Sequence, residues 1–379
     1  MKTKLFYTLS LLNITILLST VSCNNDAKNS SNSNSDLNNN QTDTMMNVET
    51  ITPMGPQPAW GPTIKPEMLA VIEKLISYND KPVEELSAVE ARKNHTPTDA
   101  VMDLIKEKNI EVPVAKVDTT GRDIEVKGGN IHLRIYTPQG NNEILPVIVY
   151  YHGGGFVIAD LDVYDASAKC LSEQANAVVV SVAYRMGPEF KFPTAHQDAF
   201  AAYEWTIKNA GDIKGDPKRI AVAGESAGGN LATNVSIMAR DKGIMMPVHQ
   251  LLIYPVSNSD MNSESYKTYA EAKPLSKAMM AWFVRNYLNN TAEGKNPMIS
   301  IVNANLKGLP STTIIQAEID PLQSEGMLLA EKLKAANVKV DLKKYEGVTH
   351  EFFGMSAVVP QAKDAQAYAA KNLKSSFNK

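Results

Sequence analysis

The sequence predicts an α/β fold in which a mostly parallel central sheet is flanked by helices on both faces. Short apolar segments alternate with stretches of helical periodicity, such as residues 166–175, along the middle of the chain. The apolar segments are residues 147–151, 178–182, 220–223, 251–254 and 313–315. Strands that are apolar along their whole length are typical of a parallel sheet whose two faces are both covered.

Two helices, a hairpin and an edge strand are predicted before and after this series of apolar segments. Apolar residues recur with helical spacing over residues 66–78 and, more weakly, 99–108, which predicts two helices before the first strand. Residues 124–126 and 131–136, joined through Gly-Gly-Asn, predict a hairpin at one edge of the sheet. Residues 338–345 alternate apolar and charged side chains, so we expect a half-exposed edge strand there.

The first residues are typical of a segment that is removed from the mature protein. Lys2 and Lys4 precede an apolar run over residues 5–18, which is too short for a comfortable membrane span and gives way to small polar residues. These features predict a signal peptide over residues 1–22. The segment ends at Thr-Val-Ser-Cys, which resembles a bacterial lipobox, although Thr20 stands where Leu is most usual.

The lipobox resemblance implies that Cys23 becomes the lipidated first residue of an exported, membrane-anchored lipoprotein, at the periplasmic face or outer membrane of a bacterium. The alternative is cleavage by ordinary signal peptidase next to an incidental cysteine. Residues 24–44 are almost wholly Asn, Ser and Asp, with no apolar face to offset the entropy of ordering them. We therefore expect a flexible tether over residues 23–58 and one folded domain over 59–379.

Composition excludes several classes of function. The formal net charge is −3 and there is no basic block, so nothing provides the positive surface that nucleic acid requires. With only two cysteines, the chain has neither a disulfide framework nor a cysteine cluster for zinc. We expect no nucleic-acid partner, no metal and no organic cofactor, and the oligomeric state stays open.

The motif Gly-Glu-Ser-Ala-Gly-Gly around Ser226 directly follows the apolar segment 220–223 and precedes a helical run over 230–240. A strand, a tight turn and a helix are the context in which a nucleophilic serine is held above a sheet. The glycines two residues before and after the serine keep side chains out of a crowded turn. The sequence therefore predicts Ser226 as a nucleophile.

A second motif, His-Gly-Gly-Gly-Phe, begins at His152, where the apolar segment 147–151 stops. Three glycines cost chain entropy and pack nothing, but they leave backbone N–H groups free to bind a developing oxyanion. A flexible turn is the alternative, although it needs fewer glycines. We expect His152 and Gly153 to support the loop rather than to react.

A serine hydroxyl needs a base and an orienting acid. His350 follows the last predicted strand, at the end of a strand where α/β sites gather, whereas the other histidines occupy poorer positions. Three carboxylates follow the strand that ends near residue 315, namely Glu318, Asp320 and Glu325, and Asp320 is best placed on a tight turn. The chain order Ser226, Asp320, His350 is that of an α/β-hydrolase triad.

With these motifs the chain resembles the bacterial hormone-sensitive-lipase-like esterases from about Trp60 to the C-terminus. Tyr-Arg-Met-Gly-Pro-Glu from Tyr184 matches as well. The resemblance implies the α/β-hydrolase fold, the three triad roles above, and an oxyanion hole made by the N–H groups of Gly154, Gly155 and Ala227. It also implies a helical cap from about residues 60–115 and 257–300, which would include Tyr266, Trp282, Phe283 and Tyr287. Three positions depart from the family pattern: Glu225, Gly187 and Glu351.

The sequence thus predicts a carboxylic ester hydrolase that works through an acyl-serine intermediate on small-molecule esters. Because the bulky Trp282 and Phe283 fall in the predicted cap, we expect an enclosed pocket and a preference for short acyl chains. An amide deacetylase with the same triad is an alternative, and a non-catalytic ligand-binding protein of this fold is another. An anchored structural lipoprotein would explain the N-terminus but not the triad.

Overall fold

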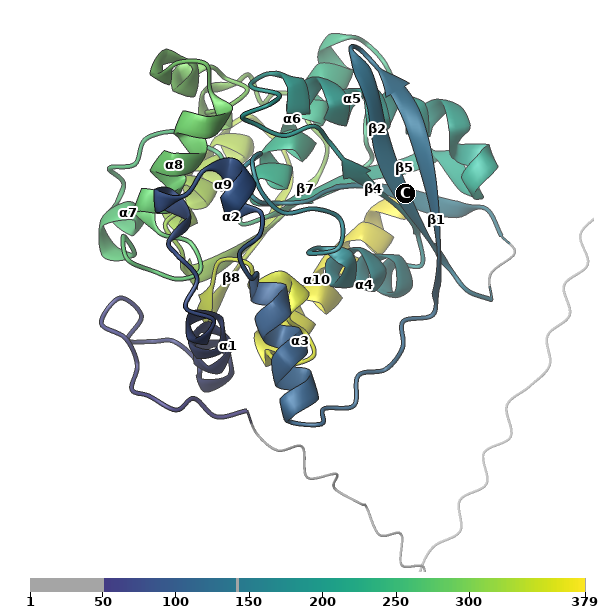
Figure 1. The fold of residues 1–379 in the computed structure, drawn as a ribbon. Helices are drawn as coiled ribbons and strands as arrows, with labels where there is room; N and C mark the ends of the chain where they lie inside the picture. Colours follow the sequence, from purple (N-terminus) through teal and green to yellow (C-terminus); the bar gives the residue numbers. More distant parts are fainter. Residues whose placement is uncertain (1–50, 141–142, 379) are drawn as a thin grey trace, which may run out of the picture. The chain divides into compact units, whose positions relative to one another are not determined.

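The central sheet is the element on which the domain is built. The computed structural model describes residues 51–140 and 143–378. Within them the strands lie in the order β1-β2-β4-β3-β5-β6-β7-β8 (Figure 1). The β1–β2 and β2–β4 pairs are antiparallel, and the other neighbouring pairs are parallel. The strands are β1 (Val117–Val126), β2 (Gly129–Pro138), β3 (Leu145–Tyr151), β4 (Val178–Ala183), β5 (Gly215–Glu225), β6 (Gln250–Ile253), β7 (Thr312–Ile319) and β8 (Val340–Thr349).

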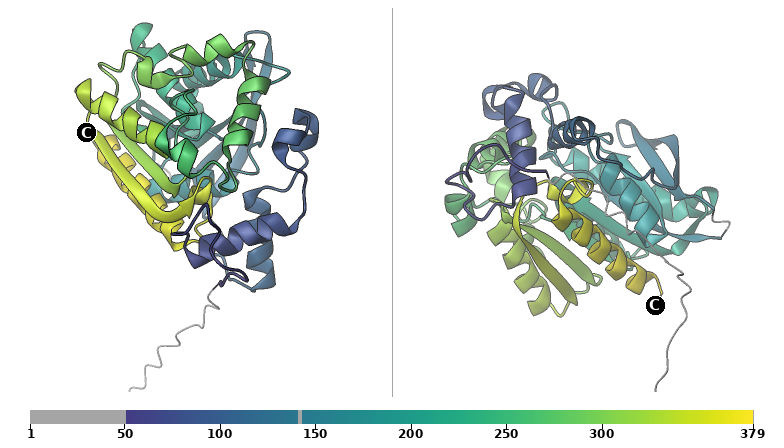
Figure 2. Two further views of the ribbon diagram at one scale, coloured as in Figure 1. Left: turned by 90° about the vertical axis from the view of Figure 1, so that its left-hand side faces the viewer. Right: turned by 90° about the horizontal axis from the view of Figure 1, so that it is seen from below.

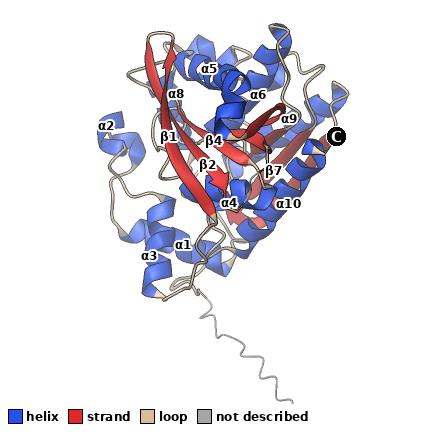
Figure 3. Cartoon of the chain, turned by 90° about the vertical axis from the view of Figure 1, so that its right-hand side faces the viewer, coloured by secondary structure: helices blue, strands red, loops and turns tan. Residues whose placement is uncertain are grey.

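Helices surround this sheet (Figure 3). The buried residues of α5, α6, α8 and α9 belong to one apolar cluster, and those of α1, α3, α4 and α10 to another. The α-helices are α1 (Pro66–Ser77), α2 (Ala88–Ala91), α3 (Pro97–Glu107), α4 (Asp165–Ala175), α5 (Thr194–Asn209), α6 (Ala227–Asp241), α7 (Glu264–Thr268), α8 (Lys277–Tyr287), α9 (Gln323–Ala335) and α10 (Pro360–Phe377). Short helical turns are η1 (Val83–Glu85), η2 (Ala210–Ile213), η3 (Thr291–Lys295), η4 (Ile301–Asn303) and η5 (Phe352–Gly354).

Successive residues of β3 belong to different clusters. Val147, Val149 and Tyr151 join the cluster that contains α5 and α6, whereas Ile148 and Tyr150 join the one that contains α4 and α10. Since both faces are covered, all positions of this strand are buried, and the sequence is apolar without interruption. The predicted fold class is confirmed.

The two predicted edge elements are present, with different lengths. Ile124 pairs with Ile131 across the hairpin turn, as expected, but β1 begins already at Val117. The residues between Val117 and Ile124 are exposed, so no apolar pattern marks them, and pairing with β2 keeps them extended. β8 ends the strand order, as expected, and extends to Thr349.

Packing begins before the predicted domain boundary at residue 59. Ile51 is buried, and the N–H groups of Met54 and Gly55 donate to the carboxylate of Glu73 on α1 at 2.6 and 2.7 Å. The prediction of a tether up to residue 58 is therefore wrong for residues 51–58. The predicted signal peptide, Cys23 and the rest of the tether lie outside the described residues. In residues 51–140 and 143–378, no helix combines the length and apolar character needed to cross a bilayer.

The N-terminal helices lie against two different parts of the domain. α1 lies beside the end of β8 (Figure 2), where the N–H of Lys65 donates to the carbonyl oxygen of Gly347 at 2.8 Å. The segment between η1 and α2 contacts α8 (Figure 1). There the indole N–H of Trp282 donates to the carbonyl oxygen of Leu86 at 2.9 Å. The two chain segments predicted to form a cap are thus in contact with each other.

Candidate active site

Ser226 lies on the tight turn between β5 and α6. Its backbone has φ 55° and ψ −117°, a conformation that is strained for a residue with a side chain. A Cβ on Gly224 would lie 2.2 Å from the backbone of Gly228, and a Cβ on Gly228 would lie 1.9 Å from the carbonyl oxygen of Tyr151. Strand and helix approach so closely that only glycine fits at these two positions, which explains the spacing of the motif.

The structure brings the three predicted triad residues together. Nε2 of His350 lies 2.9 Å from Oγ of Ser226, and Nδ1 of His350 lies 2.6 Å from Oδ2 of Asp320. Asp320 directly follows β7 and His350 directly follows β8, so adjacent parallel strands place the acid beside the histidine. Ser226, His350 and Asp320 are 5%, 3% and 0% exposed, so the whole group is buried.

Two opposing effects act on the imidazole of His350. Burial by itself lowers the pKa of His350, but the charge and hydrogen bond of Asp320, together with the charges of Glu351 and Glu225, outweigh burial and raise this pKa above 6.5. An imidazole of raised pKa is a stronger proton acceptor in its neutral form. The arrangement therefore has the geometry and the electrostatics of a general base on a serine hydroxyl.

The glycine loop after β3 lies close to the turn that holds Ser226, since a Cβ on Gly153 would lie 3.3 Å from the carbonyl oxygen of Glu225. Gly154 and Gly155 have φ of 89° and 59°, and a Cβ on Gly155 would lie 2.3 Å from the ring of Phe283 on α8. Among the hydrogen bonds of the described residues, none uses the N–H of Gly154 or Gly155. Ala227 is the first residue of α6, where helical N–H groups lack an intrahelical acceptor. All three predicted oxyanion donors are thus available to an acceptor.

His152 is part of the packing beneath this loop. It is 1% exposed, its ring is stacked on that of Tyr184 with centroids 4.3 Å apart, and the Tyr184 hydroxyl donates to the carbonyl oxygen of His152 at 2.9 Å. Burial lowers the pKa of His152 to about 4, so the ring is neutral at neutral pH. This environment is that of a supporting residue, as the sequence predicts.

Glu225, the residue before Ser226, is bonded to two buried tyrosines. It is 1% exposed and accepts hydrogen bonds from the hydroxyls of Tyr150, at 2.5 Å, and Tyr254. Burial, followed by the charge of Glu351, raises the pKa of Glu225 to about 7. Glu225 is thus a buried carboxyl group whose pKa is close to neutral pH, and it is the chain neighbour of Ser226.

Glu351, the residue after His350, is a second carboxyl near the triad. The Tyr164 hydroxyl donates to both of its oxygens, at 2.7 and 2.8 Å. A Cβ on Gly153 would lie 2.2 Å from that hydroxyl, so the absence of a side chain at residue 153 leaves room for Tyr164. Burial raises the pKa of Glu351, and the charge of His350 opposes this change. Gly153 thus supports the site through Tyr164.

The other acidic candidates have different partners. The Glu318 carboxylate accepts from the N–H of Gly347 at 2.6 Å, and the Glu325 carboxylate accepts from the N–H of Ser257 at 2.7 Å. Burial raises the pKa of Glu325 to about 8. Within the described residues, Asp320 is the one of the three that bonds to His350.

The remaining histidines have other partners. His196 lies between the Tyr287 hydroxyl and Oδ1 of Asn230, each at 2.9 Å, and burial lowers its pKa to about 4. His249 bonds to Thr313 and Ser376, and His95 and His132 pair with exposed aspartates. In the described part of the chain, no three His, Cys, Asp or Glu side chains are grouped as metal ligands would be.

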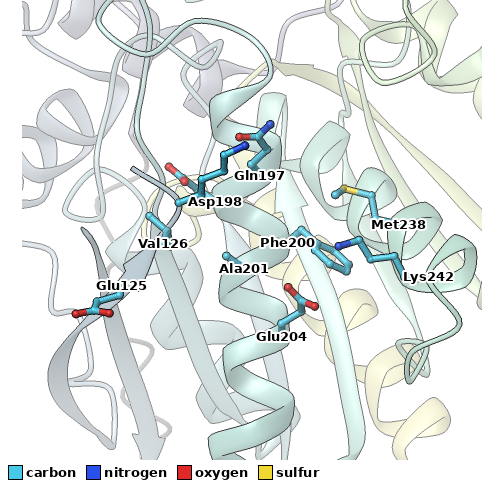
Figure 4. Close-up of a pocket in the computed structure, with 10 residues that line it drawn as sticks. Glu125, Val126, Gln197, Asp198, Phe200, Ala201, Glu204, Met238 and Lys242 are labelled. Carbon is cyan, nitrogen blue, oxygen red and sulfur yellow. The ribbon is translucent and has the colours of Figure 1, made fainter. Parts of the chain in front are cut away.

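A hollow between β1, α5 and α6 is a separate feature (Figure 4). Asp198 at its wall forms a buried ion pair with Arg185, with 2.7 Å between the charged atoms. The ammonium of Lys242 lies 4.7 Å from the ring of Phe200. None of the triad residues lines this hollow, so we do not assign the chemistry to it.

Comparisons with known proteins agree with the fold and with the site geometry. The sequence pattern of the alpha/beta hydrolase fold matches residues 148–354. The chain is 39% identical over 249 residues to the carboxylesterase NlhH of Mycobacterium tuberculosis, covering 65% of this chain and 78% of that one. It is 31% identical over 298 residues to the ethyl acetate hydrolase of Pseudomonas putida, covering 77% and 91%.

A solved structure points to the same class. The crystal structure of a thermostable esterase from Pseudomonas putida superposes with a TM-score of 0.76 at 33% identity, covering 83% of this chain and 98% of that one. The chain therefore belongs to the alpha/beta hydrolase fold family. The expected resemblance to bacterial esterases is confirmed at this level.

Three residues of the site were not identified from the sequence. Tyr150 lies near the carboxyl end of β3 and Tyr254 follows β6, on the two strands next to β5, the edge where α/β sites gather. Both tyrosines could therefore have been identified from the sequence by their position at the ends of predicted strands. Tyr164 follows no strand and belongs to no motif, and only the folded structure shows that it reaches Glu351.

Proposed function

We propose that this protein hydrolyses carboxylic esters of small molecules through an acyl-enzyme on Ser226. The chain belongs to the alpha/beta hydrolase fold family, and the two relatives named above are a carboxylesterase and an ethyl acetate hydrolase. The observation that carries the proposal is the pair of distances at His350, 2.9 Å to the Ser226 hydroxyl and 2.6 Å to Asp320. This is the geometry that activates a serine hydroxyl.

In the first step, Oγ of Ser226 attacks the ester carbonyl carbon while Nε2 of His350 takes the hydroxyl proton. Asp320 holds Nδ1–H and stabilises the imidazolium that forms. The carbonyl oxygen becomes an oxyanion, and the N–H groups of Gly154, Gly155 and Ala227 bind it. When the C–O bond to the alcohol breaks, the alcohol leaves with the proton from Nε2, and Ser226 remains acylated.

In the second step, water attacks the acyl carbon and gives its proton to Nε2 of His350. The Oγ–C bond then breaks, the proton returns to Ser226, and the carboxylic acid leaves. Every proton transfer in the two steps passes through Nε2 of His350. The reactants are therefore the ester, water and the side chains of this protein.

We propose further that short acyl chains are preferred. Phe283 packs against Gly155 of the glycine loop, and Trp282 is fixed by its hydrogen bond to Leu86. Both lie on α8, which packs near the loop beside Ser226. Each methylene adds at most about 0.8 kcal/mol while it fits within the pocket, and none once the pocket is full. We expect rates on p-nitrophenyl esters to be highest between acetate and hexanoate.

For the mature protein we propose export and anchoring through a lipid on Cys23. Lys2 and Lys4, the apolar run 5–18 and the lipobox-like Thr-Val-Ser-Cys support this proposal. The catalytic domain would then act on small esters outside the cytoplasm.

The test is hydrolysis of p-nitrophenyl acetate by the full chain and by Ser226→Ala. We expect a folded variant with activity reduced by about a thousandfold or more, because a triad acts as a unit. Ser236→Ala is the matched control, since Ser236 is a buried serine of α6 whose hydroxyl donates to the carbonyl oxygen of Ala232 in the same helix. Near-normal hydrolysis by folded Ser226→Ala would refute the proposal.

A further inference from the structure

Glu351 is held in a conformation that favours glycine. Its φ is 70°, in the left-handed region, where a residue with a side chain is strained and glycine is not. Its side chain is 19% exposed, and both carboxylate oxygens accept from the Tyr164 hydroxyl. The strained backbone and the hydrogen-bonded carboxylate together indicate that the Glu351 side chain has a fixed position and is not a freely solvated surface group.

The carboxylate faces the reacting side of His350. Oε1 of Glu351 lies 3.8 Å from Nε2, the nitrogen that faces Ser226, whereas Asp320 bonds to Nδ1. The imidazole is therefore flanked by one carboxylate on each side. An oxygen atom about 2.9 Å from both Nε2 and Oε1 is within hydrogen-bond reach of each, since these atoms are 3.8 Å apart.

The second half of the proposed reaction needs such an oxygen atom at Nε2, and the present inference rests on the proposed function. Water has two O–H groups, so one can donate to Nε2 and the other to Glu351. An alcohol has one O–H, and its alkyl group would be placed against the carboxylate. We propose that Glu351 is a positioning residue that selects water over alcohols as the acceptor of the acyl group.

The water proton that faces His350 moves to Nε2 as the oxygen forms a bond to the acyl carbon, and the second proton stays on that oxygen, donated to Oε1 of Glu351. The Oγ–C bond of Ser226 then breaks, and the proton on Nε2 moves to Oγ. Glu351 therefore gains no proton over the cycle and acts only by orienting the acceptor.

The test is the partition of the acyl-enzyme between two acceptors. The full chain hydrolyses p-nitrophenyl acetate in the presence of 1-propanol, and the ratio of propyl acetate to acetate is measured by gas chromatography. In Glu351→Met, which keeps the length of the side chain without its oxygens, we expect this ratio to rise about tenfold, as for the loss of one hydrogen bond to a charged group. Glu351→Gln keeps an acceptor oxygen and should give a smaller rise.

The control is Glu346→Gln, which removes a charge at an exposed position of β8 and should leave the ratio unchanged. The ratio does not depend on how much of a variant is folded and active. Should Glu351→Met fold too poorly to measure, Tyr164→Phe removes the hydroxyl that fixes the carboxylate, and the ratio should again rise. An unchanged ratio in the measurable variants overturns the inference. Failure of the proposed function would be seen in a different experiment, since Ser226→Ala would then still release p-nitrophenol.

Discussion

The ring of Phe283 occupies the space next to Gly155, so that a Cβ on Gly155 would lie 2.3 Å from it. Phe283 comes from α8 and Gly155 from the loop after β3, and the contact joins a helix outside the sheet to the predicted oxyanion hole. If the acyl chain lies beside this loop, as proposed, we expect the size of the side chain at residue 283 to affect which acyl chains fit.

Replacing Phe283 with Ala should shift the acyl-chain preference. The change removes most of the ring beside the glycine loop, and each methylene that the enlarged pocket accepts adds up to about 0.8 kcal/mol. We expect kcat/KM on p-nitrophenyl esters to peak at a longer chain than for the unmodified protein. Phe190→Ala, at a partly exposed ring, is the control. A peak at the same chain length in both variants would show that Phe283 does not limit the pocket.

The rate should depend on the ionisation of His350. Protonated His350 cannot accept the serine proton, and the pKa of His350 is raised above 6.5 because Asp320 outweighs burial. We expect kcat/KM to fall as pH is lowered through a value above 6.5. Asp320→Asn removes the main raising effect, so its remaining activity should persist to lower pH. A pH profile that is flat down to about pH 5 would point to a different base.

Glu225 should make stability depend on pH. Its pKa is about 7 in the folded protein, against a usual 4.5, because burial disfavours its charge. Between these values the unfolded chain has lost the proton that the folded chain keeps, so this group lowers stability as pH rises from about 4.5 to 7. Full ionisation would cost roughly 3 kcal/mol.

Glu225→Gln removes this group while keeping the shape of the side chain. The measurement is urea unfolding of both proteins at several pH values. The free energy of unfolding of the unmodified protein, minus that of Glu225→Gln, should decrease from pH 4.5 to 7. A difference that stays constant or increases would show that Glu225 is ionised in the folded protein throughout this range.

The proposed anchor predicts where the protein is found in the cell. If Cys23 carries two or three acyl chains, the expressed full-length protein should fractionate with membranes and resist a salt wash, since one chain alone gives marginal binding. Cys23→Ser should appear in soluble or unprocessed form. An unmodified protein that is wholly soluble, with a mature N-terminus other than residue 23, would disprove the anchor and leave the esterase proposal intact.

The fold was predictable because burial on both faces leaves a clear mark in the sequence. The unbroken apolar run of β3 reflects two covered faces, whereas β1 before Ile124 is exposed and carries no such mark. The beginning of the domain was missed for a similar reason. Ile51 is one buried residue among several prolines, so no apolar periodicity marks it.

The triad was predictable because each member directly follows a strand or a tight turn. Ser226, Asp320 and His350 follow β5, β7 and β8, and parallel strands end at a common edge. The contacts of Glu351 could not be predicted in this way. They depend on Tyr164, which lies far away in the chain, and on the space left by Gly153.

The central claim is that Ser226 is the nucleophile and that His350 activates it. The most direct measurement is reaction of the full chain with a fluorophosphonate, followed by mass spectrometry of the digested protein. We predict one phosphonate per chain on Ser226, loss of ester hydrolysis in proportion to labelling, and much slower labelling in His350→Ala. Complete hydrolysis activity after the reagent, or labelling at a residue other than Ser226, would contradict the account.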